Sequence, residues 1–192
     1  MKNITGFLIA GIILALLAGF WFLSQHGGMV ALNEVAKQDW TDLEAQLQRR
    51  NDLIPDLVSG VKGYAPDGED VFTAVSDAGG KLAAAATPAA KAEADVELTD
   101  ALGRLLALAG SHPEATADET FFRLRKELAD AERSIADARK NYNEHVDLYN
   151  MCIDQFPGSF FAGRMGLLPR ERFETPSASA GEPGTTAPPD QM

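Results

Sequence analysis

The longest hydrophobic stretch of the chain lies near its beginning, where residues 4–23 read ITGFLIAGIILALLAGFWFL without a single charged side chain. Twenty helical residues rise about 30 Å, which is the thickness of the hydrocarbon core of a bilayer. Trp21 and Phe22 stand at the end of the run, where interfacial aromatic side chains are expected. The pattern therefore predicts a transmembrane helix over residues 4–23, preceded by a short cap at residues 1–3.

A cleaved signal peptide is the alternative interpretation of this run. The apolar region of a signal peptide has about 7–15 residues and ends at a cleavage site with small side chains. The run is longer, and SQHGGMV follows it, so the pattern favours an uncleaved anchor. Lys2 precedes the run and the next basic residue is Lys37, so the positive-inside rule favours a bundle outside the cytoplasm.

Apolar residues recur with helical spacing from Met29 to Phe156, with almost no strand signal. In the first stretch they alternate in steps of three and four, as in packed helices, until about Tyr64. Pro55 removes one backbone hydrogen bond, so we expect a kink or a tightened turn between Asn51 and Pro55. The inner face of this helix is predicted to contain Ala36, Trp40, Leu43, Leu47, Arg50, Ile54, Leu57, Val61 and Tyr64.

Three further helices follow in the pattern. The second starts near Asp67 and Asp70, and the third has Thr87 as its N-cap and Pro88 at its first helical position. After a loop over residues 111–120, the fourth continues to Phe156, and Pro157-Gly158 ends it. The predicted inner face of the second helix contains Val71, Phe72, Val75, Ala78, Leu82 and Ala85. That of the third contains Ala92, Val96, Leu98, Leu102, Leu105 and Ala109. That of the fourth contains Phe121, Leu124, Leu128, Ala131, Ile135, Ala138, Tyr142, Val146, Tyr149, Ile153 and Phe156.

Four helices with short connections form an antiparallel up-down-up-down bundle most economically. The predicted fold class is therefore all-α. It is a four-helix bundle over residues 24–156 with long first and last helices, preceded by one transmembrane helix. In this topology Trp40 should contact Tyr142 or Val146, and the last helix should end near the membrane.

The segment after the bundle, residues 157–174, is apolar and basic. In this topology it returns to the membrane side, where its arginines could meet anionic head groups at the bilayer interface. The alternative is that it folds onto the end of the bundle. Residues 175–192 are rich in Pro, Ala, Ser, Gly and Thr and are expected to be disordered. The candidate interfacial residues are Phe160, Phe161, Arg164, Leu167, Leu168, Arg170 and Arg172.

Composition and reactive side chains exclude several functions. The net charge of −11 argues against a nucleic-acid partner, which would require a basic surface. Cys152 is the single cysteine, so neither an intramolecular disulfide nor a cysteine-based zinc site can form. His112 and His145 lack the Glu-x-x-His spacing of bundle di-metal sites. We therefore expect no cofactor, no metal and no enzymatic activity.

One charged residue, Arg50, occupies a predicted core position. A buried arginine needs a partner and can then fix the register of packed helices. The antiparallel pairing of the first and last helices makes Glu132 the predicted partner. The alternative is a ligand-binding arginine. The candidate polar site comprises Arg49, Arg50, Asp52, Pro55, Glu132, Tyr142, Asn143, Tyr149 and Asn150.

Several motifs, in order, resemble the LemA family. They are QRRNDLIPDLV at residues 48–58, VKGY at 61–64, ALGRLL at 101–106, ARKNYN at 138–143 followed by Tyr149-Asn150, and Phe156-Pro157 with Phe173-Glu174. The resemblance covers about residues 30–174. It implies a membrane-anchored antiparallel bundle in the bacterial inner membrane, without established catalytic activity, and some relatives are linked to the biogenesis of membrane organelles.

Two functions fit these observations. The first is a membrane-anchored, non-catalytic scaffold or adaptor whose partners are the lipid bilayer and an unidentified membrane or membrane-associated protein. The sequence leaves open whether the chain also forms a homo-oligomer. The second is a binding module that recognises a small anion or a peptide at the kink between Arg49 and Pro55. An accessible cavity lined by Arg50 and Tyr142 would favour the second function, and a filled helix seam the first.

Overall fold

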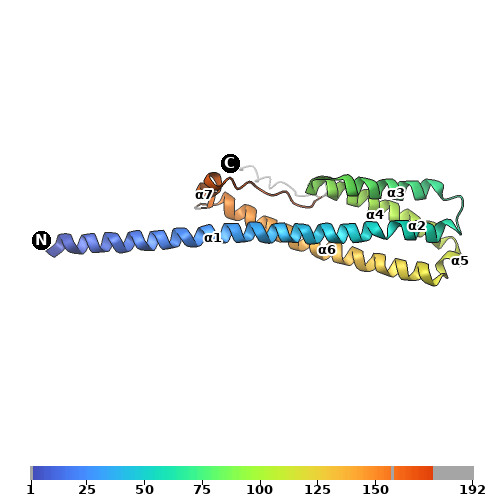
Figure 1. The fold of residues 1–192 in the computed structure, drawn as a ribbon, viewed down its shortest axis with the longest axis horizontal. Coiled ribbons are helices and arrows are strands. Elements are labelled where there is room, and N and C mark those ends of the chain that lie inside the picture. Colours follow the sequence, from blue (N-terminus) through green and yellow to red (C-terminus); the bar gives the residue numbers. More distant parts are fainter. Residues whose placement is uncertain (1, 157, 175–192) are drawn as a thin grey trace, which may run out of the picture. The chain divides into compact units, whose positions relative to one another are not determined.

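A computed structural model describes the backbone of residues 2–156 and 158–174, and the side chains of residue 13 and of residues 28–156 and 158–174. Within these residues there are helices and no strands, which confirms the predicted all-α class. The helices, shown in Figure 1, are α1 (Lys2–Asp52), α2 (Ile54–Lys62), α3 (Glu69–Ala84), α4 (Pro88–Gly110), α5 (Pro113–Thr116), α6 (Glu119–Asp154) and α7 (Gly158–Met165).

The predicted transmembrane run at residues 4–23 belongs to α1, but apart from Ile13 its side chains lie outside the described ones. Within the described part of the chain, no helix combines the length and the apolar character that crossing a bilayer requires. Pro157 and the tail at residues 175–192, which was expected to be disordered, also lie outside the described residues.

The chain divides into two compact units. The first unit contains Met1–Thr41 and Lys140–Arg170, and the second contains Asp42–Arg139 and Glu171–Met192. Helices α1 and α6 each contribute one part to the first unit and another part to the second. The polar residues predicted from the sequence are therefore distributed over both units.

In the first unit, α1 and α6 run antiparallel. The rings of Trp40 and Tyr142 lie 5.2 Å apart between their centroids, and His145 contacts Asp39. Further toward the beginning of α1, Met29 belongs to the same buried cluster as Tyr149 of α6. The predicted contact between Trp40 and Tyr142 is therefore confirmed.

Helix α7 packs onto this pair of helices. Phe161 and Ala162 are buried in the cluster that contains Met29. Gly158 begins α7 in close contact with α6, since a Cβ atom at this position would lie 1.8 Å from the carbonyl oxygen of Cys152. Only glycine fits there without moving the backbone. The apolar segment after the bundle therefore folds back onto α1 and α6, which was one of its two sequence interpretations.

In the second unit, residues 42–52 of α1 run parallel to α4. Lys91 of α4 forms an ion pair with Glu44 of α1 at 3.4 Å. Further toward the C-terminal ends of the two helices, Asp95 of α4 pairs with Arg50 of α1. Both pairs advance in the same direction along the two helices, which fixes their parallel orientation.

Helices α3 and α6 run in the opposite direction within the second unit. Gly79, late in α3, lies against Asn51, whereas Glu69, at the beginning of α3, pairs with Lys62 at the end of α2. Phe121, near the start of α6, lies against Gly60 near the end of α2. Within this unit the successive helices thus alternate in direction, and the short connection after Ala84 places α3 beside α4 (Figure 1).

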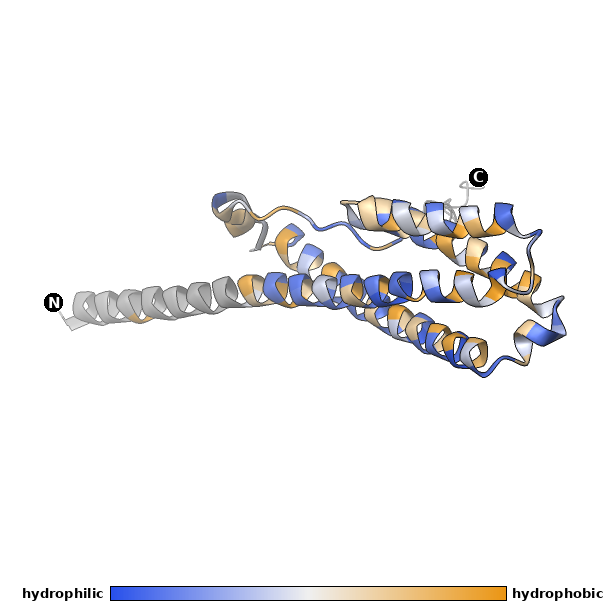
Figure 2. Ribbon diagram, turned by 45° about the vertical axis from the view of Figure 1, so that its right-hand side comes forward, coloured by the Kyte–Doolittle hydropathy of each residue, from blue (hydrophilic) through white to orange (hydrophobic). Residues whose placement is uncertain are grey.

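The predicted inner faces are mostly buried, and Figure 2 shows hydrophobic and hydrophilic residues alternating along the helices. Two of the predicted inner-face positions were wrong. Val96 is 45% exposed because α4 instead turns Asp95 inward, toward Arg50. Phe156 is 84% exposed because α6 ends at Asp154, so the helical spacing no longer applies to it.

The break between α1 and α2 has the cause expected from the sequence. Because Pro55 has no N–H group, it cannot donate to the Asn51 carbonyl. The chain tightens there, and the Leu53 N–H donates to the carbonyl of Arg50 at 3.2 Å, over three residues instead of four. The predicted tightened turn between Asn51 and Pro55 is confirmed, although α2 ends at Lys62 instead of Tyr64.

The caps of the later helices also follow the sequence. Thr87 accepts a hydrogen bond from the Ala90 N–H at 3.2 Å, and Pro88 is the first residue of α4. The loop expected at residues 111–120 contains the short helix α5, which also begins with a proline, Pro113.

Two adjacent glycines in α3 have different roles. Although glycine has a low helix propensity, α3 continues through both. A Cβ atom on Gly79 would lie 2.6 Å from the Asn51 side-chain oxygen and 2.9 Å from Ile54. A Cβ atom on Gly80 would meet nothing within 4 Å. Gly79 therefore lets α3 approach the helix break closely, and Gly80 does not contribute to this contact.

These two positions provide a matched test. Gly80→Ala should stabilise the chain by about 1 kcal/mol, because alanine has the higher helix propensity. Gly79→Ala should destabilise it by about 1–3 kcal/mol, because the new methyl group overpacks the contact with Asn51. Urea unfolding of the full-length chain, followed by circular dichroism, measures both. Changes of the same sign in the two variants would contradict the packing described here.

Candidate functional site

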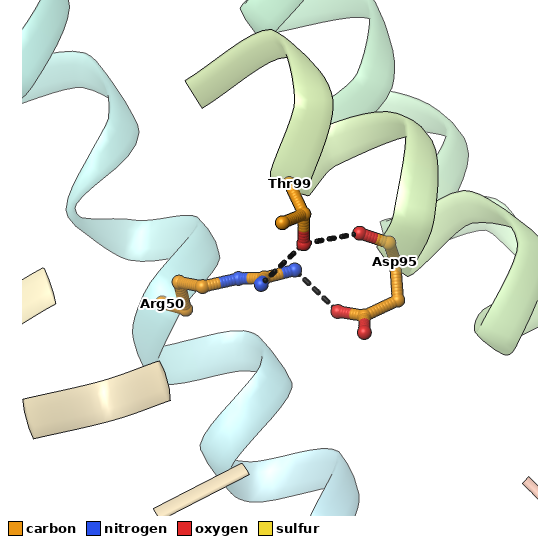
Figure 3. Close-up of polar contacts among 3 residues, drawn as sticks. All are labelled: Arg50, Asp95 and Thr99. Carbon is orange, nitrogen blue, oxygen red and sulfur yellow. Dashed lines mark hydrogen bonds and ion pairs between the residues drawn. The ribbon is translucent and has the colours of Figure 1, made fainter. Parts of the chain in front are cut away.

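Arg50 is the centre of a buried polar cluster in the second unit. The residue is 2% exposed, and its Nη2 atom donates to the carboxylate of Asp95 on α4. Its Nη1 atom donates to the Thr99 hydroxyl at 3.2 Å, and that hydroxyl donates to the Asp95 carbonyl at 2.8 Å. Figure 3 shows the guanidinium of Arg50 extending from α1 toward these two residues of α4.

Glu132 was the wrong partner for Arg50. It is exposed on α6, whereas Asp95 on α4 takes the ion pair. The prediction paired Arg50 with the last helix from the antiparallel register alone. In the structure, however, the guanidinium extends toward the parallel neighbour α4. An aspartate within an alanine-rich helical stretch gave no sequence signal that distinguished it from the surface carboxylates.

The Asp95 carboxyl group experiences two opposing influences. Burial raises the pKa of Asp95 above its ordinary value of 3.8, and the charge and hydrogen bonds of Arg50 lower it to a smaller extent. A buried ion pair forms only if attraction between the partners compensates for the lost hydration of both. Its clearest consequence is alignment, because any shift of α4 along α1 would leave one charge buried without its partner.

The other polar residues around the break lie on the surface. Arg49, Asp52 and Pro55 are exposed, and the Gln48 side chain donates to Asp52 at 2.6 Å. Arg50 therefore points away from its polar sequence neighbours and into the helix seam. This geometry fits a structural ion pair better than a ligand-binding arginine.

A double-mutant cycle tests this structural role. Arg50→Met or Asp95→Leu alone should cost about 3–5 kcal/mol of unfolding free energy, because each leaves the other charge buried and unpaired. The double variant should lie much closer to wild type, because two apolar side chains then fill the seam. Arg49→Met is the matched control and should change stability by less than about 0.5 kcal/mol. Additive costs in the double variant would contradict a direct pair.

In the first unit, Tyr142 is almost fully buried at 1% exposure, and its ring packs against Trp40. Asn143, its neighbour on α6, is half-buried. The ion pair of His145 with Asp39 was missed by the sequence analysis, because neither residue belongs to a recognised motif. Tyrosine rings at helical spacing pack in this seam and do not line an open site.

Tyr149 and Asn150 hold the chain segment that follows α7. The Asn150 amide donates to the carbonyl of Arg170 and accepts from its N–H, both at 2.9 Å. The Tyr149 hydroxyl donates to the Leu168 carbonyl at 3.0 Å. Burial raises the pKa of the Tyr149 hydroxyl, which keeps it protonated as a donor. We call residues 166–170 the strap, because these hydrogen bonds fasten it to α6.

The strap begins at a turn that requires glycine. It ends at Arg170, which makes two further contacts. Gly166 has φ +67°, and the Leu167 N–H donates to the Ala162 carbonyl at 3.0 Å, as in a Schellman motif. The Arg170 Nε atom donates to the Asn33 side chain of α1 at 2.9 Å, and its guanidinium lies over the ring of Tyr149. Both α1 and α6 therefore hold the strap in the first unit.

The candidate interfacial residues divide into exposed and packed groups. Phe160, Arg164 and Leu168 are exposed. Phe161 is buried, Leu167 is partly buried against the same cluster, and Arg170 is held by the strap contacts. Arg172 belongs to the second unit and pairs with Glu174 at 2.6 Å. For Phe161, Leu167 and Arg170 the interfacial prediction was wrong, because the sequence could not show which side of this segment faces α1 and α6.

A polar hollow in the second unit was also missed. It has a volume of about 740 Å³ and is lined by residues of α2, of the start of α6 and of the turn between α5 and α6. Asp118 caps α6 here by accepting from the Phe121 N–H at 2.9 Å, and it also accepts from the Tyr64 hydroxyl at 3.4 Å. The backbone hydrogen bond from Phe121 is the main reason that the pKa of Asp118 lies below 3.8.

The Asp118 cap predicts a pH dependence. A carboxyl group with a lowered pKa in the folded chain stabilises that chain above pH 3.8, and this contribution is lost as the pH falls through the folded pKa. Asp118→Asn keeps an N-cap side chain but removes the charge. The stability advantage of wild type over Asp118→Asn should therefore shrink as the pH falls from 6 toward 3. Urea unfolding at several pH values measures it, and a constant difference would contradict the assignment.

Within the described side chains, no group of three or more His, Cys, Asp or Glu residues is arranged to hold a metal ion. His112, one of the histidines considered from the sequence, lies in the turn before α5 near Glu114 at 3.7 Å. Cys152 is a partly buried free thiol at the edge of the cluster that contains Met29.

These features define the class: an all-helical protein of long antiparallel helices, with a buried Arg–Asp pair and a fastened C-terminal strap. The chain belongs to the LemA family, whose sequence model matches residues 39–186 and so confirms the resemblance. It is similar to magnetosome protein MamQ of Magnetospirillum gryphiswaldense, with 25% identity over 177 residues, covering 79% of this chain and 65% of that protein.

Magnetosome protein MamQ 2 of Paramagnetospirillum magneticum is similar to the same degree. It is 24% identical over 178 residues, again covering 79% of this chain and 65% of the relative. The chain therefore spans about 65% of the length of these curated relatives.

Proposed function

We propose that the chain is a membrane-anchored, non-catalytic helical scaffold, inserted into a bacterial inner membrane through residues 4–23. The absence of charge over twenty residues supports the anchor. Ile13, the residue of this run whose side chain is described, is 52% exposed, as expected of a residue that faces lipid. The positions of Lys2 and Lys37 support a bundle on the outer side of that membrane.

One observation carries the proposal: α1 is a single unbroken helix from Lys2 to Asp52. The apolar run and the first bundle helix therefore share one backbone, with no flexible linker between them. Because the apolar run lies within the helix, its backbone N–H and C=O groups beyond the first turn can bond within the helix, which a membrane span requires. The part of α1 that belongs to the first unit therefore follows the run without a break, which supports an anchored scaffold.

The burial of the polar residues supports a scaffold over a binding module. The alternative module would need an accessible cavity lined by Arg50 and Tyr142, but Arg50 is 2% exposed and bound to Asp95 and Thr99, and Tyr142 is 1% exposed. The second unit instead presents apolar side chains on its surface, with Phe122 at 65% and Val96 at 45% exposure. Exposed aromatic residues of this kind are typical anchors for a protein partner.

Alkaline carbonate extraction of cell membranes tests the anchor. Wild type and a conservative Ile13→Leu/Leu17→Ile variant should stay in the pellet. Ile13→Lys/Leu17→Lys should move to the supernatant, because each central lysine costs about 2.5–3.5 kcal/mol of insertion free energy. The intact mass of the extracted wild type should include residues 4–23. Release of wild type by carbonate, or a mass without the run, would refute the anchor.

The same membranes test the scaffold. A photoreactive phenylalanine at position 122 should crosslink to a discrete second protein, and one at the exposed position 137 on α6 should not. The crosslink should persist in Arg49→Met, which leaves the bundle intact. Uncrosslinked monomer at every surface position would contradict a partner-binding scaffold.

A further inference from the structure

Three large apolar side chains in and next to α7 are exposed, although one side of the helix is buried. Phe156, Phe160 and Leu168 are exposed by 84%, 60% and 76%. Arg164 is also exposed and lies four residues after Phe160, on the same face of α7. We call these four residues the α7 surface. The α7 surface therefore combines three exposed apolar side chains with one exposed positive charge.

Contacts on the buried side of α7 and in the strap fix the position of the α7 surface. Phe161 and Ala162 of α7 are buried with Met29 of α1, and the Phe160 ring packs edge-on against the Phe161 ring, 5.3 Å between their centroids. The Leu168 carbonyl is bound by the Tyr149 hydroxyl, which fixes the backbone from which the Leu168 side chain projects. The exposure of these apolar groups is therefore imposed by packing on α1 and α6.

Helix α1 sets the distance from this surface to the apolar run. Met29, which packs beside α7, follows Leu23 by six residues of the same helix. At 1.5 Å per residue this corresponds to about 9 Å along the helix. Head groups add about 5–8 Å to the hydrocarbon core on each side of a bilayer. Met29 and the part of α7 that packs beside it therefore lie at the outer edge of the head-group layer when residues 4–23 cross the bilayer.

Next to α7, the first unit also has a groove of about 420 Å³. It is lined by the apolar residues Met151, Ile153, Ala162, Leu167 and Pro169 and by two polar residues, Asn150 and Asp154. The apolar part of the lining lies next to α7 and the strap, and Asp154 adds one carboxylate to it.

We propose that the α7 surface binds the surface of an anionic phospholipid bilayer. Phe156, Phe160 and Leu168 enter the boundary between head groups and acyl chains, and the Arg164 guanidinium binds head-group phosphates. The proposal rests on the proposed function, because the anchor in α1 brings α7 to the bilayer. It adds a second lipid contact that fixes the first unit against the membrane.

Site-directed labelling of the full-length chain in lipid nanodiscs tests the proposal. In a Cys152→Ala background, single cysteines replace Ile13, Phe160, Leu168 or Phe122, and each carries a nitroxide label. Electron paramagnetic resonance then compares the accessibility of each label to oxygen, which concentrates in lipid, and to a water-soluble nickel complex. Position 13 reports the anchor, positions 160 and 168 report the α7 surface, and position 122 is the exposed control on the second unit.

We expect lipid-like accessibility at positions 13, 160 and 168, and aqueous accessibility at position 122. A lipid-like label at 13 with aqueous labels at 160 and 168 overturns the inference and leaves the anchor intact. An aqueous label at 13 overturns the proposed anchor, and lipid-like labels at 160 and 168 would then still support the α7 surface.

A second part of the experiment varies the charge of the lipid. Adding phosphatidylglycerol to phosphatidylcholine nanodiscs should move the label at position 160 deeper in wild type and in the control Arg49→Gln. Arg164→Gln should lose this shift, because no guanidinium then attracts the anionic head groups. A shift that is unchanged in Arg164→Gln would overturn the role of Arg164.

Discussion

Arg50 and Asp95 face each other inside the second unit, and the packing around them follows from this pair. Neither charge can be buried alone, so α1 and α4 must align where the carboxylate and the guanidinium meet. This requirement turns Asp95 inward and leaves its apolar neighbour Val96 on the surface. A hydrophobic seam tolerates a shift by one turn, whereas an ion pair between two fixed positions does not. The pair thus gives a mostly apolar bundle one register.

Close approach of helices is the second constraint, and glycine makes it feasible. The break at Pro55 moves Asn51 and Ile54 toward α3, and α3 has no side chain at Gly79. In the first unit, Gly158 lets α7 turn back against the carbonyl of Cys152. In both places a methyl group would collide with atoms already present. At both sites the close approach therefore requires glycine.

The unbroken helix α1 connects these constraints to the proposed function. It contains the apolar run, the residues that hold α7 and the strap, and the arginine of the buried pair. Asn33, near the middle of α1, binds Arg170, so the strap is fastened to the same helix. Under the proposed function, the anchor and the α7 surface would hold the first unit to the membrane at two points.

The sequence by itself determined the all-α class, the tightened turn at Pro55, the cap at Thr87 and the contact between Trp40 and Tyr142. These features depend on local chemistry or on helical periodicity, which neighbouring residues encode. Only the tertiary structure decided that Arg50 pairs with Asp95 and not Glu132, and that Phe161 is buried while Phe160 is exposed. Periodicity defines the inner face of a helix, but the choice among several neighbouring helices depends on how all of them pack together.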